Sequence, residues 1–551
     1  MPYPNRRRIM QPGRGSGPFL GHRCNLSPKV VRTFVRRAAR ECFTKAPLVA
    51  SRRVVALLAV LFATFTCATA ARAGVVQTRV AGGTVVGTAA DGIASYKGIP
   101  YAAPPIGDLR WRPPQPPPAW PGSLDASDYG PSCPQPTPPA RVRADSRAAS
   151  TSEDCLTLNV WVPTAHAAPL PVMVFVHGGG NTAGTGSQTF YDGTSFAHDG
   201  VMLVTFNYRL GLLGFFAHPA LSAEQTDSPR GNYGLLDQIA ALQWVKANAA
   251  AFGGDPANVT VFGESAGALD IVALATAPLA KGLFDRAIVE SAGGAWDAFP
   301  ALAQAEQHGA ALATKFGLPG VRATAAQLRT IPVATLAAGD DEEGAGDPIV
   351  DGRLITETAV SAFARGLSLP MIIGVNDDEG SLLQDGDPEQ MFPRIGAADM
   401  ATLRKGFAAE GITENRAVAS RLFGDAYFDA PARWFAAHDP AAYLYRFDYI
   451  MDVLQRRRSG AQHGSEIPFV FESWSTSLLV DADRQTGATL HGCWVAFART
   501  GTPSCPGAPS WPLYTRSADR QMVFGTDATA SVQAVRDAPE FDLLERDFLS
   551  P

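Results

Sequence analysis

A serine in a glycine-rich turn is the first candidate for chemistry in this sequence. Gly263–Gly267 is G-E-S-A-G; it follows the apolar run Val259–Phe262 and precedes an apolar helix predicted over Leu269–Leu274. In a strand–turn–helix unit of this kind, the glycines let strand and helix approach closely and the turn exposes the serine hydroxyl. The amide after the serine then faces the developing oxyanion. We predict that Ser265 is a nucleophile; the alternative is a glycine-rich turn whose serine takes no part in chemistry.

A second glycine-rich segment could stabilise negative charge. His177–Gly180 is H-G-G-G and follows directly on the apolar run Leu170–Val176. Glycines leave backbone N–H groups unobstructed, and this motif type forms an oxyanion hole. A phosphate-binding loop is the competing interpretation, but Asn181–Ala183 follows where that loop requires G-K-[ST]. We expect His177 to support the loop rather than to act as a base.

A nucleophilic serine needs a histidine base that a carboxylate orients. In the strand–turn–helix context above, the chain order is serine, acid, histidine. Beyond Ser265 the histidines are His308, His438, His463 and His491. His308 and His491 lie in predicted helices, and His438 lies at a helix end, where a cation is favourable. His463 alone lies in a loop after a predicted strand, so we predict that it is the base.

The acid is expected where a buried strand ends. The apolar run Met371–Val375 is followed by Asn376 and then by Asp377, Asp378 and Glu379. In open α/β folds, catalytic groups collect at the carboxyl ends of the strands. The residues alone do not choose among these three carboxylates.

The elements that must position these residues are buried strands alternating with helices. Continuous apolar runs at 170–176 and 201–206 are typical of strands buried on both faces, and a helix is predicted over 233–251. Further strands are predicted at 259–262, 287–289, 371–375 and 443–447. This alternation predicts an α/β fold with a large, mostly parallel sheet covered by helices on both faces, and a small antiparallel portion near the N-terminus. We expect residues 74–551 to form one domain.

The motifs together resemble those of the type-B carboxylesterases, the α/β-hydrolase family that includes cholinesterases and bacterial carboxylesterases. Besides the serine turn and the H-G-G-G loop, the resemblance is carried by the segments 97–102, 107–111, 153–160, 252–256, 374–381 and 463–471. It covers nearly all of residues 74–551.

The resemblance implies roles for individual residues. It makes Glu379 the acid of a catalytic triad with Ser265 and His463. It gives the oxyanion N–H groups to Gly179, Gly180 and Ala266. It assigns support of the triad to Glu264, Ser291 and Glu466. Cys133 and Cys155 would form the family's N-terminal disulfide, and Cys493 and Cys505 could form a second one.

One position departs from the family pattern inside the site. Asn181 stands where the family often has an aromatic residue after the glycines. We therefore expect the acyl side of the pocket to be more polar than in those relatives.

The implied function is a serine carboxylesterase that hydrolyses small-molecule esters through an acyl-enzyme intermediate. Neither a cofactor nor a metal is needed, and no metal-ligand spacing of His and Cys occurs. One alternative is a hydrolase specialised for an unusual ester, lactone or carbamate. The other is a non-catalytic binding protein of the same fold; the complete set of triad residues argues against it, because such proteins have lost the serine.

Residues 1–73 differ in composition from the rest of the chain. Residues 1–53 hold thirteen lysines and arginines against one acid; the apolar run Val54–Thr66 and the small-residue pattern Ala71–Ala73 follow. This order is typical of a secretory signal peptide, and the run is too short to span a bilayer. We therefore expect a secreted or periplasmic protein. The first fifty residues exceed what a signal peptide needs, so we expect a misassigned translation start; a basic nucleic-acid-binding arm is the alternative.

The remaining chain is acidic. Without residues 1–73, 33 lysines and arginines face 51 aspartates and glutamates, a net charge of about −18. Such a surface argues against nucleic acid or an anionic membrane as partner. No apolar stretch after residue 73 is long enough to cross a membrane, and the oligomeric state does not follow from the sequence.

Overall fold

The fold is built around one β-sheet that contains both parallel and antiparallel strands. The computed structural model describes residues 74–136, 147–148, 150–296, 299–339, 346–383, 385–474 and 479–549. The predicted signal peptide and the residues before it lie outside the described residues. Among the described residues the sheet has thirteen strands.

The centre of the sheet is parallel. In spatial order it consists of β7 (Met202–Phe206), β6 (Leu170–Val176), β8 (Gly254–Glu264), β9 (Arg286–Glu290), β10 (Met371–Asn376), β11 (Ala442–Phe447) and β12 (Arg520–Phe524). Strand β13 (Ala530–Ala534) closes one edge antiparallel to β12. At the other edge, β1 (Gly74–Val80), β2 (Gly83–Ala90), β3 (Ile93–Pro100) and β5 (Thr157–Pro163) form an antiparallel portion, with β4 (Ser123–Asp125) beside β2.

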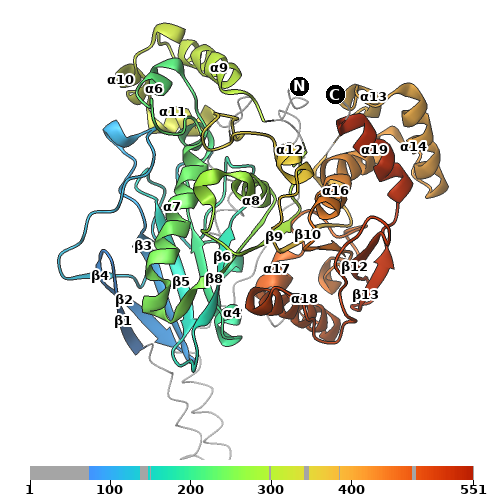
Figure 1. The fold of residues 1–551 in the computed structure, drawn as a ribbon, viewed down its shortest axis with the longest axis horizontal. Helices are drawn as coiled ribbons and strands as arrows, with labels where there is room; N and C mark the ends of the chain where they lie inside the picture. Colours follow the sequence, from blue (N-terminus) through green and yellow to red (C-terminus); the bar gives the residue numbers. More distant parts are fainter. Residues whose placement is uncertain are drawn as a thin grey trace, which may run out of the picture. The chain divides into compact units, whose positions relative to one another are not determined.

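Both faces of the parallel centre of the sheet are buried, which explains the continuous apolar runs. Along β6, Val172, Val174 and Val176 belong to one hydrophobic core, while Met173 and Phe175 belong to the other. Helices α7 (Tyr233–Asn248), α8 (Ala266–Thr276) and α16 (Ala430–His438) complete the first core. Helices α4 (Thr194–His198), α17 (Ile467–Phe471) and α18 (Asp481–Thr500) complete the second. Figure 1 shows α7 and α8 lying over the strands on one face.

The remaining helices complete the fold. They are α5 (Gly211–Gly214), α6 (Pro219–Ala223), α9 (Leu302–Lys315), α10 (Ala325–Arg329), α11 (Val333–Ala338), α12 (Ala359–Ala364), α13 (Pro388–Met391), α14 (Ala397–Ala409), α15 (Asn415–Gly424) and α19 (Ala538–Leu549). Helix α15 continues through the π-helical turn Asp425–Asp429 into α16.

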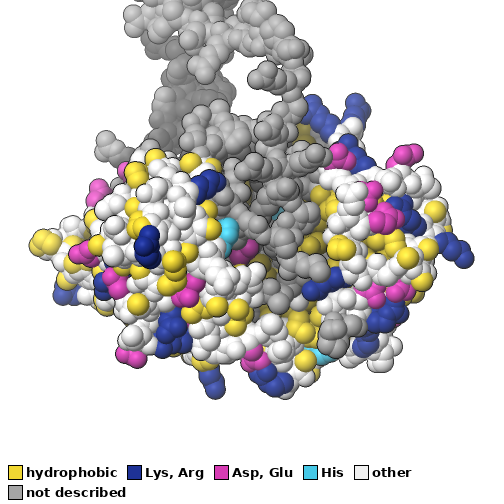
Figure 2. Space-filling model, turned by 90° about the horizontal axis from the view of Figure 1, so that it is seen from above, with side chains coloured by type: hydrophobic (Ala, Val, Ile, Leu, Met, Phe, Trp, Pro, Cys, Tyr) yellow, Lys and Arg dark blue, Asp and Glu magenta, His cyan; other side chains and the backbone are white. Residues whose placement is uncertain are grey.

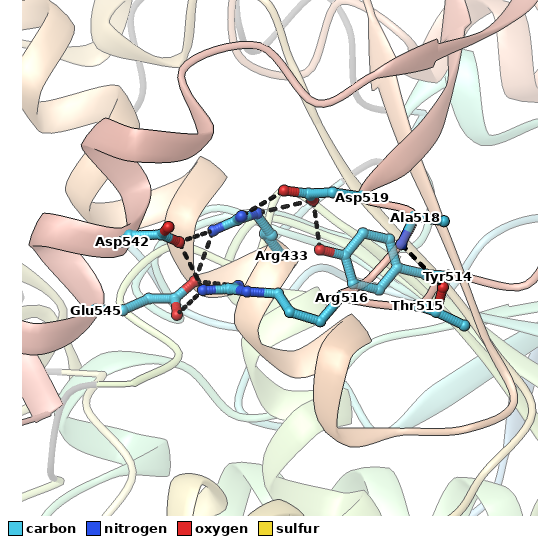
Figure 3. Close-up of polar contacts among 8 residues, drawn as sticks. All are labelled: Arg433, Tyr514, Thr515, Arg516, Ala518, Asp519, Asp542 and Glu545. Carbon is cyan, nitrogen blue, oxygen red and sulfur yellow. Dashed lines mark hydrogen bonds and ion pairs between the residues drawn. The ribbon is translucent and has the colours of Figure 1, made fainter.

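An ion-pair network ties the C-terminal helix α19 to α16 (Figure 3). The buried guanidinium of Arg433 lies 2.5 Å from Asp519 and 2.7 Å from Asp542. Arg516, which is more exposed, pairs with Asp542 and Glu545 at 2.6 and 2.7 Å. Helix α19 is also attached through apolar contacts, since Phe541 and Leu544 are buried in the first core and Phe548 stacks on Trp296.

Charged side chains of both signs are spread over the face seen in Figure 2. None of the described helices combines the length and the hydropathy needed to cross a membrane. Two disulfides are present, Cys133–Cys155 and Cys493–Cys505, with Cα atoms 5.1 and 4.3 Å apart.

The topology brings the candidate residues together at the carboxyl ends of the central strands. Strand β8 ends at Glu264, directly before Ser265, and its neighbour β6 ends at Val176, before the glycine loop. Strand β10 ends at Asn376, before the acidic run. Because carboxyl ends of parallel strands lie at the same edge, residues distant in sequence meet there.

Candidate active site

Ser265 lies in a strained turn between β8 and α8. Its φ and ψ are 58° and −125°, a conformation that side chains rarely adopt, and its N–H donates to the carbonyl of Glu290 at 2.9 Å. A Cβ atom at Gly263 or Gly267 would lie 2.6 or 2.2 Å from the carbonyl oxygen of Val176. The two glycines are therefore required for the close passage of β8 and α8 past β6.

Ser265 opens into a cavity of about 180 Å³. The cavity is lined by Gly180, Asn181, Ser265, Ala266, Leu269, Gly293, Gly346, Asp347, Pro348, Phe423, Tyr427 and Phe428. Its aromatic wall comes from the end of α15 and the π-helical turn that follows. A second cavity of about 180 Å³ is lined by His463 and by Tyr449, Leu454, Arg458 and Phe469.

Three backbone N–H groups near Ser265 remain available to an anionic oxygen. The N–H groups of Gly179, Gly180 and Ala266 donate to no acceptor within the described part of the chain. Gly179 and Gly180 have φ values of 111° and 63°, and a Cβ atom at Gly179 would lie 2.2 Å from the carbonyl oxygen of Ala183. The glycines of this loop thus allow a tight turn that leaves two donors free.

The three carboxylates of the acidic run have different partners in the structure. Glu379 Oε2 lies 2.5 Å from His463 Nδ1. Asp377 instead pairs with Arg536 at 2.7 Å, and the Asp378 side chain makes no hydrogen bond with His463. Of the three carboxylates, Glu379 is therefore the one that contacts the imidazole.

The second carboxylate oxygen of Glu379 is also held. Oε1 accepts from Ser291 Oγ at 2.5 Å and from the backbone N–H of Asn376 at 2.8 Å. The Asn376 side chain donates to Glu466, so Glu466 reaches the acid through Asn376 rather than directly. Sequence reasoning missed Asn376; its one signal was its position as the last residue of β10, directly before the acidic run.

The other imidazole nitrogen faces Glu264. His463 Nε2 lies 3.1 Å from Glu264 Oε1, and it makes no hydrogen bond with Ser265 among the described residues. Because Ser265 directly follows Glu264, the serine lies next to the group that Nε2 contacts. The ring of Phe428 packs edge-on against His463, with centroids 5.3 Å apart.

Buried carboxylates control the charge of the site. Burial alone would lower the pKa of His463, but the carboxylates of Glu379 and Glu264 outweigh it and raise that pKa to about 10. Burial raises the pKa of Glu264, against the opposing effect of His463. Burial and the nearby Glu264 raise the pKa of Glu466 to about 8.

The other histidines lie outside this arrangement. His308 is in α9; His438 stacks on Trp434 at the end of α16, with ring centroids 3.8 Å apart; and His491 is in α18. His177 is buried, which lowers its pKa to about 4, and its ring stacks on Tyr208. Among the described residues, no group of three or more His, Cys, Asp or Glu side chains is arranged to hold a metal.

Asn181 belongs to the cavity lining, but its side-chain amide is bonded inside the protein. The residue is 1% exposed, and its side-chain Nδ2 donates to Asp270 while its Oδ1 lies near the Tyr208 hydroxyl. Its amide is therefore directed into the protein because buried partners satisfy both of its ends.

The family of the chain follows from its similarity to known proteins. Residues 72–400 and 403–542 match the carboxylesterase family. The chain belongs to the carboxylesterase family. This carboxylesterase is 38% identical over 470 residues to the fumonisin B1 esterase of Sphingopyxis macrogoltabida, covering 81% of this chain and 85% of that protein. It is 35% identical over 473 residues to the para-nitrobenzyl esterase of Bacillus subtilis (strain 168), covering 81% and 94%.

Solved structures of carboxylesterases are also similar to this chain. A PNB esterase structure superposes on this carboxylesterase with a TM-score of 0.73 and 33% identity, covering 85% of this chain and 99% of the other. A carboxylesterase of Geobacillus stearothermophilus gives a TM-score of 0.73 at 32% identity with the same coverage. The predicted α/β-hydrolase fold is confirmed, and the protein is a carboxylic ester hydrolase.

Proposed function

We propose that this carboxylesterase hydrolyses esters through a covalent intermediate on Ser265, with His463 as general base and Glu379 as the acid that orients it. The observation that carries the proposal is the 2.5 Å contact between Glu379 Oε2 and His463 Nδ1. In the neutral imidazole this contact favours the proton on Nδ1 and leaves Nε2 to accept one. The strained turn at Ser265 and the free N–H groups beside it support the same assignment.

The chemistry proceeds in two halves. Ser265 Oγ attacks the ester carbonyl carbon while His463 Nε2 takes its proton, and the carbonyl oxygen becomes an oxyanion that the N–H groups of Gly179, Gly180 and Ala266 stabilise. The C–O bond to the alcohol then breaks, and the alcohol leaves with the proton from His463. Water repeats the steps on the acyl-enzyme and releases the acid.

His463 must turn from Glu264 toward Ser265 for the proton transfer. Hydrogen bonds between catalytic groups are often long in unliganded enzymes and shorten when substrate binds. Glu264, Ser291 and Glu466 support the triad in this proposal: Glu264 contacts Nε2 of the resting imidazole, Ser291 holds Glu379, and Glu466 holds Asn376.

The volumes of the two cavities limit the size of the substrate. We propose that the cavity lined by Ser265 and the one lined by His463 accommodate the two parts of a small ester, each cavity being about 180 Å³. The relatives are named for quite different substrates, among them fumonisin B1, para-nitrobenzyl esters and phenmedipham. The acyl and alcohol preferences therefore depend on lining residues such as Phe423, Tyr427 and Phe428.

The test is hydrolysis of short-chain p-nitrophenyl esters by residues 74–551 and by Ser265→Ala. We expect the wild type to be active and Ser265→Ala to lose activity by at least about a thousandfold. A fluorophosphonate probe should label only the wild type. Full activity in Ser265→Ala would overturn the triad, and failure of the folded wild type to take the label would favour a binding role.

We also propose that the protein is exported and that cleavage follows Ala73. The two disulfides support this, since such bonds persist in oxidising compartments. Expression of the full chain in a secreting bacterial host, followed by intact-mass measurement of the exported protein, tests it. A mature N-terminus at Gly74 is expected, and accumulation of uncleaved chain inside the cell would contradict export.

A further inference from the structure

A buried polar bridge joins the two segments that supply the proposed oxyanion N–H groups. Asn181, directly after Gly180, donates from Nδ2 to Asp270 Oδ1 at 2.9 Å. Asp270 lies on α8, the helix that begins at Ala266 directly after Ser265. The bridge spans 89 residues of sequence, so it connects the glycine loop to the helix only through the tertiary structure.

The bridge has further supports on both sides. Gln238 of α7 donates to Asp270 Oδ2 at 2.5 Å. The Tyr208 hydroxyl lies 2.7 Å from the carbonyl oxygen of His177 and 3.0 Å from Asn181 Oδ1, so its single proton is shared between the two ends of the loop. The carbonyl of Asn181 accepts from the N–H of Gly211 at 2.7 Å.

Asp270 is an unusual residue to bury. It is fully buried, and its hydrogen-bond partners in the described part of the chain are the two amides of Asn181 and Gln238, with no lysine, arginine or histidine. Burial raises the pKa of Asp270 to about 7, against the effect of the two amides. A buried carboxyl without a cationic partner reduces stability, and this favours a role in positioning over a role in folding.

The backbone of Asn181 has a related constraint. Its φ is 54°, in the left-handed region that asparagine tolerates better than most residues. Asparagine therefore meets two requirements at once: it continues the turn begun by Gly179 and Gly180, and it carries an amide long enough to reach α8.

We infer that Asn181 and Asp270 are positioning residues that set the distance between the loop N–H groups of Gly179 and Gly180 and the helix N–H group of Ala266. This inference rests on the proposed function, because it concerns the oxyanion that the proposed mechanism forms. Donors must lie about 3 Å from the oxyanion, so a small shift of one segment against the other reduces transition-state stabilisation with little effect on ester binding.

The test distinguishes loss of the Asn181 amide from disturbance of the backbone turn at that residue. Asn181→Gly removes the amide but keeps a residue that tolerates a positive φ. We expect kcat for p-nitrophenyl acetate to fall about tenfold, less than the loss of a whole donor, while KM changes less than about twofold. Asn248→Ala is the matched control: Asn248 is a buried asparagine that bonds Ala81 N–H at the end of α7, away from the site. It should keep kcat.

A transition-state analogue gives a readout that a loss of stability does not move. With a trifluoromethyl ketone, Ser265 Oγ adds to the carbonyl carbon, the serine proton passes to His463, and the ketone oxygen becomes an oxyanion. Asn181→Gly should weaken this inhibitor about tenfold and leave binding of the matching methyl ketone unchanged. Asp270→Ala should weaken the trifluoromethyl ketone to a similar extent. The double variant should bind it no more weakly than either single variant, because each single change already breaks the same bridge.

A reciprocal exchange keeps the inference testable if these variants fold poorly. Asn181→Asp together with Asp270→Asn preserves a carboxylate–amide pair and should recover kcat to within about threefold of wild type. Asn181→Asp alone places two carboxyls face to face and should not recover it.

The inference is overturned if Asn181→Gly keeps wild-type kcat and trifluoromethyl-ketone affinity, or if the losses from the two single changes add in the double variant. It is also overturned if the exchange is no better than Asn181→Asp alone. None of these outcomes touches the proposed function, which stands or falls with Ser265→Ala.

Discussion

Glu264 Oε1 lies 3.1 Å from His463 Nε2, the nitrogen that must accept the serine proton in the proposed mechanism. The resting imidazole therefore lies between two carboxylates, Glu379 on one nitrogen and Glu264 on the other. This arrangement stabilises the charged imidazolium before the reaction begins, and it also stabilises the imidazolium that forms when Ser265 loses its proton.

The pH dependence of hydrolysis should reflect this pair of carboxylates. The base must be neutral, so kcat/KM should rise with pH through the pKa of His463, which Glu379 and Glu264 raise above the ordinary histidine value of 6.5 to about 10. Glu264→Gln removes one of these carboxylates and should move the midpoint to lower pH. The measurement is kcat/KM for a neutral ester across neutral and alkaline pH.

Glu466→Gln is the matched control for that shift. Glu466 also raises the pKa of His463, but it comes after Glu379 and Glu264 in size. Its removal should therefore shift the midpoint in the same direction by less. A midpoint unchanged in Glu264→Gln, or moved to higher pH, would contradict the electrostatic account of the site.

The aromatic wall of the cavity should determine acyl-chain length. Phe428 lines the cavity and packs against His463. Phe428→Ala should enlarge the cavity, so that activity on p-nitrophenyl octanoate rises severalfold relative to the acetate ester. Phe407→Ala, at a buried site on α14 away from the cavity, should lower stability and leave that ratio unchanged. Equal ratios in both variants would exclude Phe428 from substrate selection.

The two arginines of the ion-pair network in Figure 3, Arg433 and Arg516, should contribute unequally to stability. Arg433 is 2% exposed and pairs with Asp519, Asp542 and Glu545. Arg433→Ala should lower the free energy of unfolding by roughly 2 kcal/mol, since the guanidinium is buried while Asp519 and Asp542 are partly exposed to solvent. Arg516→Ala removes a side chain that is 40% exposed from the same network and should cost less than about 1 kcal/mol. Urea unfolding followed by circular dichroism measures both, and equal losses would refute the role of burial.

Residues 74–551 should contain no free thiol. The chain has seven cysteines, of which Cys24, Cys42 and Cys67 precede Gly74 and the other four form the two disulfides. Thiol titration of the denatured protein should give about zero per chain before reduction and about four after it. Two free thiols before reduction would show that one bridge does not form in solution.

The sequence by itself determined the features that depend on neighbouring residues. The apolar runs at 170–176 and 371–375 became β6 and β10 almost unchanged, because a strand buried on both faces has no polar position to interrupt it. The turn at Ser265 followed from its glycines, which short-range sterics require. The short strands β12 and β13 at the C-terminal side of the sheet were not predicted, since each has only five residues and neither alternates between buried and exposed positions.

Only the tertiary structure decided how residues distant in sequence meet. The acidic run offered three equivalent carboxylates, and the path of the chain brought Glu379 to His463 across 84 residues while Asp377 went to Arg536. Asn181 was expected to make the cavity polar, but its amide bonds Asp270 instead. The direction of a side chain depends on which buried partners satisfy its polar atoms, and those partners come from other strands and helices that local sequence does not specify.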